Sequence, residues 1–456
     1  MATKSASRGI IPGIRRRLYA SQAASRAEQG ESHLPKQDPK ITKLPNGVLV
    51  ASVENYSPLS RVSVVVNAGS RFEDGDNLGV THCLRVAASL STRNSSSFKI
   101  IRSLQQIGSN LTCSAGREYI HYSLDCTRDN VETGLGFMKD ITTSPVFKPW
   151  ELAEVQARLR VDRAVLETQP NVEVIELLHE AAFKRSLGCS LYAPSFMIGK
   201  YTSEQLQSYV SQFFTCDRLA VVGVGVDHDQ LCAESSKFTP FNPTGNEGDP
   251  VLYLGGELRK NTDNPLVYAA VAVEGPSING KDLLPSGVLQ MIMGTGPYVK
   301  YSGGTSAAHL AQAASSATSQ PFAISCINAN YQTSGLFGFC AAAQSNDIGK
   351  VLKTAFSQFA SVTKNGVTDQ ELARGKNQLK SAIHMQREDG GNLLFDMGEE
   401  ALGEKALIRL SEVDKAIDAV SVSDVVNVAK RIVNGKATMA AVGNLKNTPC
   451  LSELYK

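Results

Sequence analysis

The chain has 456 residues, of which 42% are hydrophobic and 20% are charged. These values are ordinary for a globular protein with a packed core and exclude collagen-like and intrinsically disordered chains. The 46 basic and 44 acidic residues leave a net charge of +2, and no dense basic stripe with interleaved aromatic residues occurs, which disfavours a nucleic-acid-binding function. Apolar runs such as 219–226 are far shorter than the roughly 20 residues that cross a bilayer. We therefore expect two large domains without a membrane-spanning helix.

The amino-terminal segment has the composition of a mitochondrial transit peptide. Residues 1–26 are rich in Arg, Ser and Ala and contain no acidic residue. Pro12 and Gly13 interrupt the short apolar stretch, which excludes a secretory signal peptide, whereas a disordered basic tail is the remaining alternative. Arg17 precedes the small residues Ala20 and Ser21, a pattern that resembles the sites cut by the matrix processing peptidase. We therefore expect residues 1–20 to be a transit peptide.

The rest of the chain contains a duplication. The segment Ser203–Val210 leads to the apolar run Leu219–Gly223, and 220 residues later Ser423–Lys430 leads to Met439–Gly443 with the same spacing. In both copies the first segment has a helical pattern and the second has the pattern of a buried strand. The sequence therefore predicts two homologous units.

Each unit alternates strand-like runs with helical patterns, which indicates an α+β fold made of two mixed α/β repeats. We place the first repeat at 38–232 and the second at 263–456. Between them, residues 233–262 contain three prolines and several Gly and Asn, which breaks any periodic pattern. This stretch is the expected linker.

Thr368 and Glu371 predict the start of a helix in the second repeat, because this pair has the spacing of a capping box. Leu372, Leu379 and Ile383 then recur on one helical face. We expect this helix to lie across a sheet.

A segment rich in Gly, Ser, Thr and Ala occupies residues 294–318. One interpretation is a mobile functional loop. The other is that its alanine-rich end, 307–314, begins a helix and that the glycines form the turn before it. The sequence favours neither.

Nine cysteines are scattered along the chain without a C-x-x-C pair. This distribution indicates reduced, mostly buried thiols rather than a disulfide framework, and it offers no spacing for haem attachment or an iron–sulfur cluster. We therefore expect no redox cofactor on this chain.

Three motifs remain to be explained, Leu44–Gly47, Asn67–Glu73 and Tyr331–Gly338. They resemble the insulinase-type metallopeptidases, and within them the mitochondrial branch that holds the processing peptidase subunits and the core proteins of ubiquinol–cytochrome c oxidoreductase. Each is weak alone, but together they cover both repeats. The resemblance implies two repeats of the insulinase-type fold.

Active members of this family carry H-x-x-E-H on a helix and a glutamate about 76 residues further on. Two histidines at i and i+4 share a zinc ion, the intervening glutamate activates water, and the distant carboxylate completes three protein ligands. Here His82 keeps the first position, but Arg85 replaces the base, Val86 replaces the second histidine and Asp162 stands in place of the distant glutamate. No other histidine of the chain has a second histidine within four residues (His33, His121, His179, His228, His309 and His384). We therefore expect no metal ion, no catalytic residue and no peptidase activity, with Arg85 paired to Asp162.

The resemblance implies a non-catalytic core (scaffold) subunit of respiratory complex III, peripheral to the mitochondrial inner membrane on its matrix side. It implies pairing with core protein 1 and the other subunits of a dimeric complex, around a cavity that the family suggests as a site for the presequence of the iron–sulfur subunit. Two alternatives are the non-catalytic, substrate-recognising subunit of the processing peptidase and a peptidase with unusual ligands.

Overall fold

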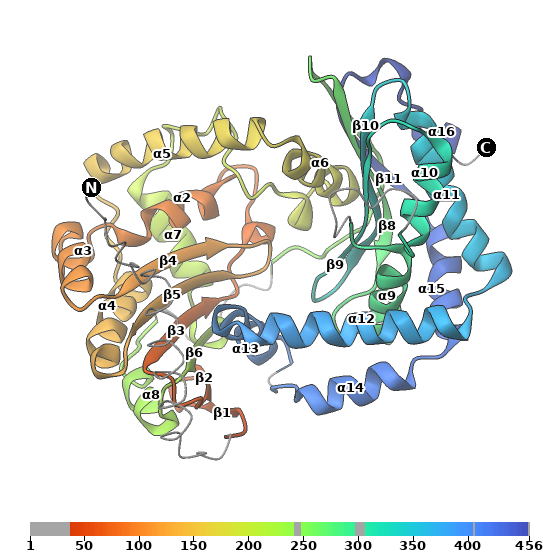
Figure 1. Ribbon diagram of the computed structural model, residues 1–456. Helices are drawn as coiled ribbons and strands as arrows, with labels where there is room; N and C mark the ends of the chain where they lie inside the picture. Colours follow the sequence, from red (N-terminus) through yellow and green to blue (C-terminus); the bar gives the residue numbers. More distant parts are fainter. Residues whose placement is uncertain (1–36, 241–247, 297–305, 405, 455–456) are drawn as a thin grey trace, which may run out of the picture.

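Two β-sheets with the same strand order organise the chain (Figure 1). The computed structural model describes residues 37–240, 248–296, 306–404 and 406–454, so the predicted transit peptide lies outside the described residues. The strands of the first sheet are β1 (Lys40–Lys43), β2 (Leu49–Val53), β3 (Leu59–Val66), β4 (Asn110–Ala115), β5 (Ile120–Thr127) and β6 (Leu219–Val224). Those of the second sheet are β7 (Glu257–Asn261), β8 (Leu266–Gly275), β9 (Ala323–Asn330), β10 (Gly335–Gln344) and β11 (Thr438–Gly443).

The order of the strands confirms the duplication. The first sheet runs β1-β2-β6-β3-β5-β4 and the second runs β7-β11-β8-β10-β9, so that five strands correspond one to one. In both sheets one pair is parallel, β2 with β6 and β7 with β11, and the other pairs are antiparallel. The predicted linker, 233–262, overlaps β7: because Glu257–Asn261 pairs with β11, these five residues belong to the second sheet. The other repeat boundaries remain a proposal.

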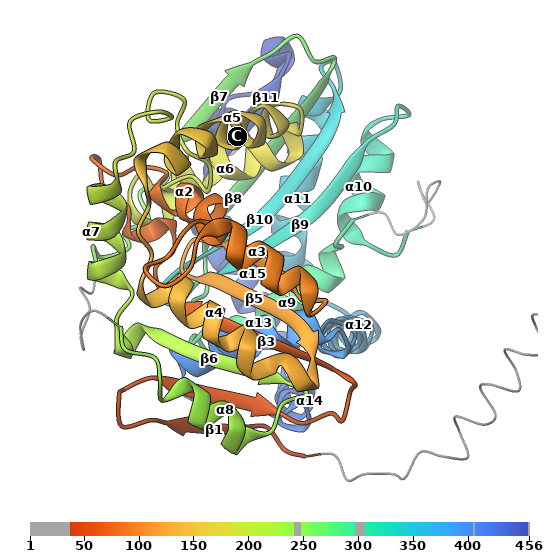
Figure 2. The ribbon, with the colours of Figure 1, turned by 90° about the vertical axis from the view of Figure 1, so that its left-hand side faces the viewer.

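Helices cover both sheets (Figures 1 and 2). In the first half they are α2 (Val80–Val86), α3 (Ser97–Gln106), α4 (Val131–Thr143), α5 (Pro149–Glu167), α6 (Pro170–Phe183), α7 (Ser203–Phe213) and α8 (His228–Ser235). In the second half they are α9 (Leu283–Met293), α10 (His309–Ala317), α11 (Ile348–Asn365), α12 (Asp369–Glu388), α13 (Gly390–Gly403), α14 (Leu410–Ala419), α15 (Val422–Asn434) and α16 (Leu451–Leu454). No helix in these described ranges is both long and apolar enough to span a membrane.

Each sheet buries one face against helices of its own half and the other face against a helix of the opposite half. Along β3, Val62, Val64 and Val66 face the core that includes α2, α4 and α7, whereas Val65 faces α13 of the second half. The period of two in a strand makes this alternation possible. The exchange is reciprocal, because α6 of the first half packs on β8 and β11 of the second sheet. Figure 1 shows α6 beside the second sheet and α13 beside the first.

Helix α12 begins as predicted but does not lie across a sheet. Thr368 Oγ1 accepts a hydrogen bond from Glu371 N (3.3 Å), and the Glu371 carboxylate accepts one from Thr368 N (2.9 Å), which forms the capping box. The helix packs on α9, α13 and α14. Its close approach to α9 needs a glycine, because a β-carbon at Gly375 would lie 2.8 Å from Ile292 Cγ1. Helix α9 already covers the sheet, so α12 forms an outer layer.

For the Gly/Ser-rich segment 294–318, the structure tests only one of the two interpretations. Its alanine-rich end is helical, as α10 shows, and residues 297–305 lie outside the described residues.

The exchange of helices predicts that a change in the second half destabilises the first sheet. Met397 on α13 is 3% exposed against β-strands of the first half, whereas Met385 on α12 is 63% exposed. Met397→Ala should cost about 2–5 kcal/mol of unfolding free energy and speed hydrogen–deuterium exchange in β2 and β6. Met385→Ala, the matched control, should change the free energy by about 0.5 kcal/mol or less. Equal exchange rates in β2 and β6 for the two variants would contradict this arrangement.

Candidate functional site

The positions singled out in the sequence meet between α2 and α5. His82 Nε2 lies 3.1 Å from Asp162 Oδ2, and Arg85 Nη2 donates to the same oxygen at 2.8 Å. The expected contact between Arg85 and Asp162 is therefore present. Val86, the last residue of α2, is partly buried against the first hydrophobic core and offers no polar group.

Glu73 fixes the start of the short helix α2. Its buried carboxylate accepts hydrogen bonds from Gly79 N (2.6 Å), Thr81 N (2.9 Å) and Thr81 Oγ1 (2.6 Å). Burial raises the pKa of Glu73 to about 7, although these hydrogen bonds oppose the increase. Gly79 has φ = 78°, and a β-carbon there would lie 2.5 Å from Ala193 Cα, so only glycine fits. This cap places His82 in the first turn of the helix.

His82 is a neutral hydrogen-bond donor at this site. Its side chain is fully buried, and burial lowers its pKa to about 4. Ala193 N donates to its Nδ1 at 3.0 Å, which places the imidazole proton on Nε2 and directs it to Asp162. The ring also meets Tyr192 edge to face at a centroid distance of 5.6 Å. The contact between His82 and Asp162 is thus a hydrogen bond rather than an ion pair at neutral pH.

Arg158 completes the group and was not identified from the sequence. Its Nε donates to Asp162 Oδ1 at 2.9 Å from one turn earlier on α5. The i,i+4 spacing of Arg158 and Asp162 on a predicted helix was the available signal. The sequence neighbours of Asp162 point elsewhere, with Arg160 directed to Gln156 and Arg163 to Ala193 O.

Asp162 is therefore held by one neutral and two cationic donors. Burial alone would raise its pKa, but the hydrogen bonds from His82 and Arg158 and the charges of Arg85 and Arg158 outweigh burial and lower it. We name these four residues, His82, Arg85, Arg158 and Asp162, the Asp162 cluster. Across the parts of the chain that the structure describes, no three His, Cys, Asp or Glu side chains are grouped to hold a metal ion. The cluster can stabilise the packing of α2 on α5, because its side chains join the two helices.

The chain is similar to insulinase-type proteins over both repeats. The model of the insulinase family (peptidase family M16) matches residues 49–195, and the model of the peptidase M16 inactive domain matches residues 200–379. Human cytochrome b-c1 complex subunit 2, mitochondrial, is 40% identical over 92% of this chain and 92% of its own length. The mitochondrial-processing peptidase subunit alpha of Solanum tuberosum is 29% identical over 90% of this chain and 83% of its own length.

A solved structure has the same fold. A chain of complex III2 from Candida albicans, with Inz-5 bound, superposes with a TM-score of 0.81 over 91% of this chain and 98% of that chain. The two chains are 21% identical.

The buried, neutral state of His82 predicts a loss of stability in acid. The unfolded histidine binds a proton below about pH 6.5, whereas folded His82 stays neutral down to about pH 4, so stability falls with pH across this window. Between pH 7.5 and 5.0 this single group should cost the native state about 2 kcal/mol. In the His82→Gln variant the unfolding free energy should fall by about 2 kcal/mol less between pH 7.5 and 5.0 than in the wild type. Denaturant unfolding of the full chain at the two pH values measures this difference.

His384→Gln serves as the control, because the His384 side chain is 47% exposed. Between pH 7.5 and 5.0, the unfolding free energy of this variant should fall as much as that of the wild type. A His82→Gln chain with the wild-type acid loss would show that His82 is protonated in the folded state.

Proposed function

The chain belongs to the insulinase family of peptidases, family M16, and we propose that it is the non-catalytic core protein 2 of the mitochondrial cytochrome b-c1 complex, respiratory complex III. The observation that carries this proposal is the similarity to cytochrome b-c1 complex subunit 2 over nearly the whole of both chains. The processing-peptidase alternative has less support, because the relatives with that name share fewer identical positions.

A scaffold role accounts for the chemistry of the Asp162 cluster. A catalytic zinc site needs three protein ligands and a base, and here Arg85 and Val86 replace the base and the second histidine. A guanidinium about 4 Å from a dication adds repulsion of several kcal/mol at an effective dielectric constant of about 20. Arg85 and Arg158 instead neutralise Asp162, a task that a metal ion performs in active relatives. We infer that the ion pairs replace the metal as the link between α2 and α5.

The tautomer of His82 gives an independent argument against zinc. Ala193 N–H donates to Nδ1, so the ring proton occupies Nε2, the nitrogen that faces Asp162. A metal on Nε2 would need the other tautomer, which would break the bond with Ala193 and leave a buried N–H without a partner. The site therefore favours a hydrogen-bonded histidine over a ligand.

The assembly and location follow from the same proposal. The chain is imported by its amino-terminal segment, pairs with core protein 1 and the other complex III subunits in the dimeric complex, and associates peripherally with the matrix side of the inner membrane. The composition of residues 1–26 supports import into mitochondria, and the similarity to cytochrome b-c1 complex subunit 2 supports assembly into complex III. Haem and the iron–sulfur cluster belong to other subunits, since the cysteine spacing suits neither cofactor.

Blue-native electrophoresis of mitochondria tests the assembly. The chain should migrate with the haem of complex III, and its removal should lower the amount of assembled complex. Amino-terminal sequencing of the band should give a start near residue 20. Migration with processing-peptidase activity and without haem would replace core protein 2 by the alternative, and a chain that begins at Met1 or Ala2 would contradict import by cleavage.

Rebuilding the zinc site tests the loss of catalysis. The wild type, Arg85→Glu and Val86→His, each paired with core protein 1, should bind no stoichiometric zinc and cleave no presequence peptide. The triple variant Arg85→Glu, Val86→His, Asp162→Glu restores the first shell of ligands, so it should bind zinc without useful turnover. Adding Arg158→Ala should raise the zinc content further, because a cation leaves the site.

The measurements are zinc per chain by mass spectrometry and peptide cleavage. One zinc per wild-type chain, or cleavage by the wild type that His82→Ala abolishes, would show a working peptidase.

A further inference from the structure

The first half contains a second polar site, separate from the Asp162 cluster. It is a cavity of about 480 Å³ whose lining includes no member of that cluster. One wall is made by two short 3₁₀ turns in contact with each other, η1 (Ser70–Phe72) and η4 (Ser186–Gly188). Ser70 Oγ donates to the carbonyl oxygen of Cys189, the residue that directly follows η4, at 3.2 Å. We name this the η1–η4 cavity.

Two buried polar atoms of this wall have no partner among the described residues. They are Arg71 Nε and Ser186 Oγ, in side chains of residues that are 9% and 4% exposed. Arg71 uses Nη1 for an ion pair of 2.5 Å with Glu118, so its guanidinium is fixed in place. Native proteins seldom leave buried polar groups unpaired, because the loss of hydration is not recovered. Two such atoms in adjoining turns indicate that a ligand with hydrogen-bond acceptors binds here.

The same wall presents unpaired positive charge. Lys184 and Arg185 line the cavity, are exposed, and have no ion-pair partner in the described part of the chain. Lys184 and Ser186 have φ values of 59° and 54°, which non-glycine residues rarely adopt. Such backbone conformations are often kept where a site depends on them. The turn thus directs a cationic surface and a hydroxyl group toward one cavity.

Three carboxylates also line the η1–η4 cavity, and two of them are already occupied. Glu73 accepts from the backbone of Gly79 and Thr81 at the start of α2, and Asp74 accepts from Asp76 N and Asn77 N at 3.1 Å each. Asp249 also lines the cavity and has no hydrogen bond among the described residues. The free donors and cations therefore lie on the η1–η4 wall.

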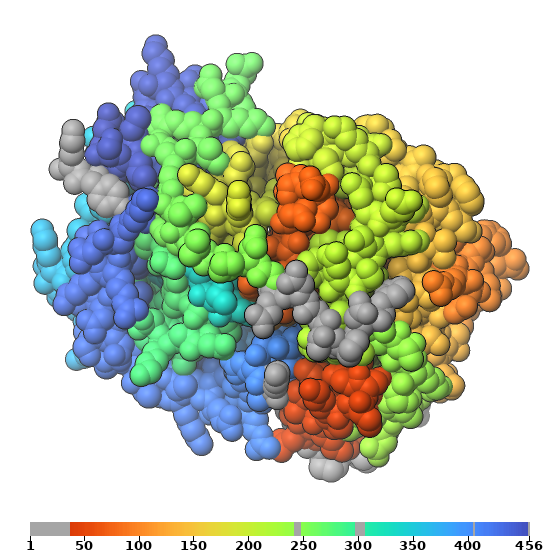
Figure 3. Space-filling model, turned by 180° about the vertical axis from the view of Figure 1, so that it is seen from behind, coloured from red at the N-terminus to blue at the C-terminus, as the bar shows by residue number. Residues whose placement is uncertain are grey.

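We propose that the η1–η4 cavity binds a small oxyanion, a carboxylate or phosphate group, against Arg71, Arg185 and Ser186. An oxyanion accepts several hydrogen bonds at once and interacts strongly with guanidinium groups, which suits the donors of this wall. On the face shown in Figure 3, the orange-red chain after β3 reaches the surface beside the segments that hold α6 and α7.

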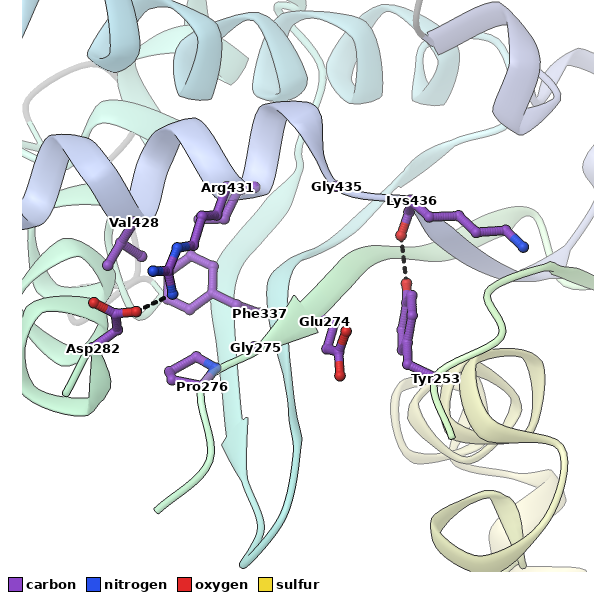
Figure 4. A pocket seen from close by; sticks show the side chains of 11 residues that line it. Tyr253, Glu274, Gly275, Pro276, Asp282, Phe337, Val428, Arg431, Gly435 and Lys436 are labelled. Carbon is purple, nitrogen blue, oxygen red and sulfur yellow. Dashed lines mark hydrogen bonds and ion pairs between the residues drawn. The ribbon is translucent and has the colours of Figure 1, made fainter. Parts of the chain in front are cut away.

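The second half provides a natural comparison (Figure 4). A cavity of about 330 Å³ lies at the corresponding corner, where β8 leaves the second sheet and α15 crosses it. Gln212 in the first cavity and Ile432 in the second occupy positions 220 residues apart, the offset of the duplication. Here Arg431 forms an ion pair with Asp282, and Tyr253 donates to Lys436 O at 2.7 Å. The Arg431 guanidinium of the second cavity is therefore neutralised by Asp282, and we expect no oxyanion to bind there.

Hydrogen–deuterium exchange of the full chain in its native assembly tests the proposal. Sodium phosphate and sodium acetate are compared with sodium chloride at equal ionic strength. Phosphate, acetate or both should slow exchange saturably in residues 70–79 and 183–189, and the anion that acts identifies the chemical group. Arg185→Gln should weaken the effect roughly fivefold, and Asp249→Asn should strengthen it by a similar factor, since one cation or one opposing charge is removed. Lys436→Gln, in the second cavity, should change nothing.

Three results would overturn the proposal. Equal protection by chloride would mean charge screening alone, and wild-type protection in Arg185→Gln would place the anion elsewhere. No protection by either oxyanion would mean that water alone satisfies the two buried atoms. Arg185 and Asp249 are surface residues outside the Asp162 cluster, so the variants leave the proposed scaffold role intact and the two proposals fail independently.

Discussion

The structure depends on the reciprocal exchange of α6 and α13. Each sheet has two apolar faces, and the helices of its own half cover only one of them. Leu178 and Phe183 on α6 close the second sheet, and Leu394 and Met397 on α13 close the first. Burial of each such side chain contributes about 1.5–3 kcal/mol. Neither repeat therefore has a complete hydrophobic core by itself, and the two form one unit despite the linker between them. In Figure 3 the two halves lie side by side in broad contact.

Polar contacts fix the position of α6 relative to the second sheet. His179 on α6 donates through Nδ1 to Ile175 O and accepts through Nε2 from Tyr331 OH at 2.7 Å, which ties α6 to the turn between β9 and β10. Gln332 N from the same turn donates to Glu118 at 3.0 Å. Since α6 follows α5 after only two residues, these contacts also fix α5 and Asp162 relative to α2. The Asp162 cluster is thus positioned by the second half of the chain, although all of its members belong to the first.

The sequence predicted what local patterns determine. The helix–strand pattern that repeats in the duplication, the buried strand at Leu219–Gly223 and the capping box of Thr368 all depend on residues close in sequence, and the structure contains them. The packing of α6 and α13 on the sheet of the opposite half was not predicted, because the apolar pattern of a helix does not show which sheet it will cover. The placement of α12 was wrong for the same reason, since its pattern could not show that α9 already occupied the sheet. Strand β7 was assigned to the linker because its edge position and its charged residues weaken the strand pattern.

Glu73 connects the two polar sites of the first half. Its carboxylate lines the η1–η4 cavity and also caps α2, the helix that carries His82 and Arg85. Because burial holds its pKa near 7, a modest change in local charge alters the balance between its two protonation states. A charge close to the cavity therefore acts on the same carboxylate that holds the first turn of α2. Through α2 such a change reaches Arg85, whose partner Asp162 is already held by two guanidinium groups. The loss of one contact at Asp162 leaves the others in place, so the packing of α2 on α5 tolerates a change in the charge of Glu73.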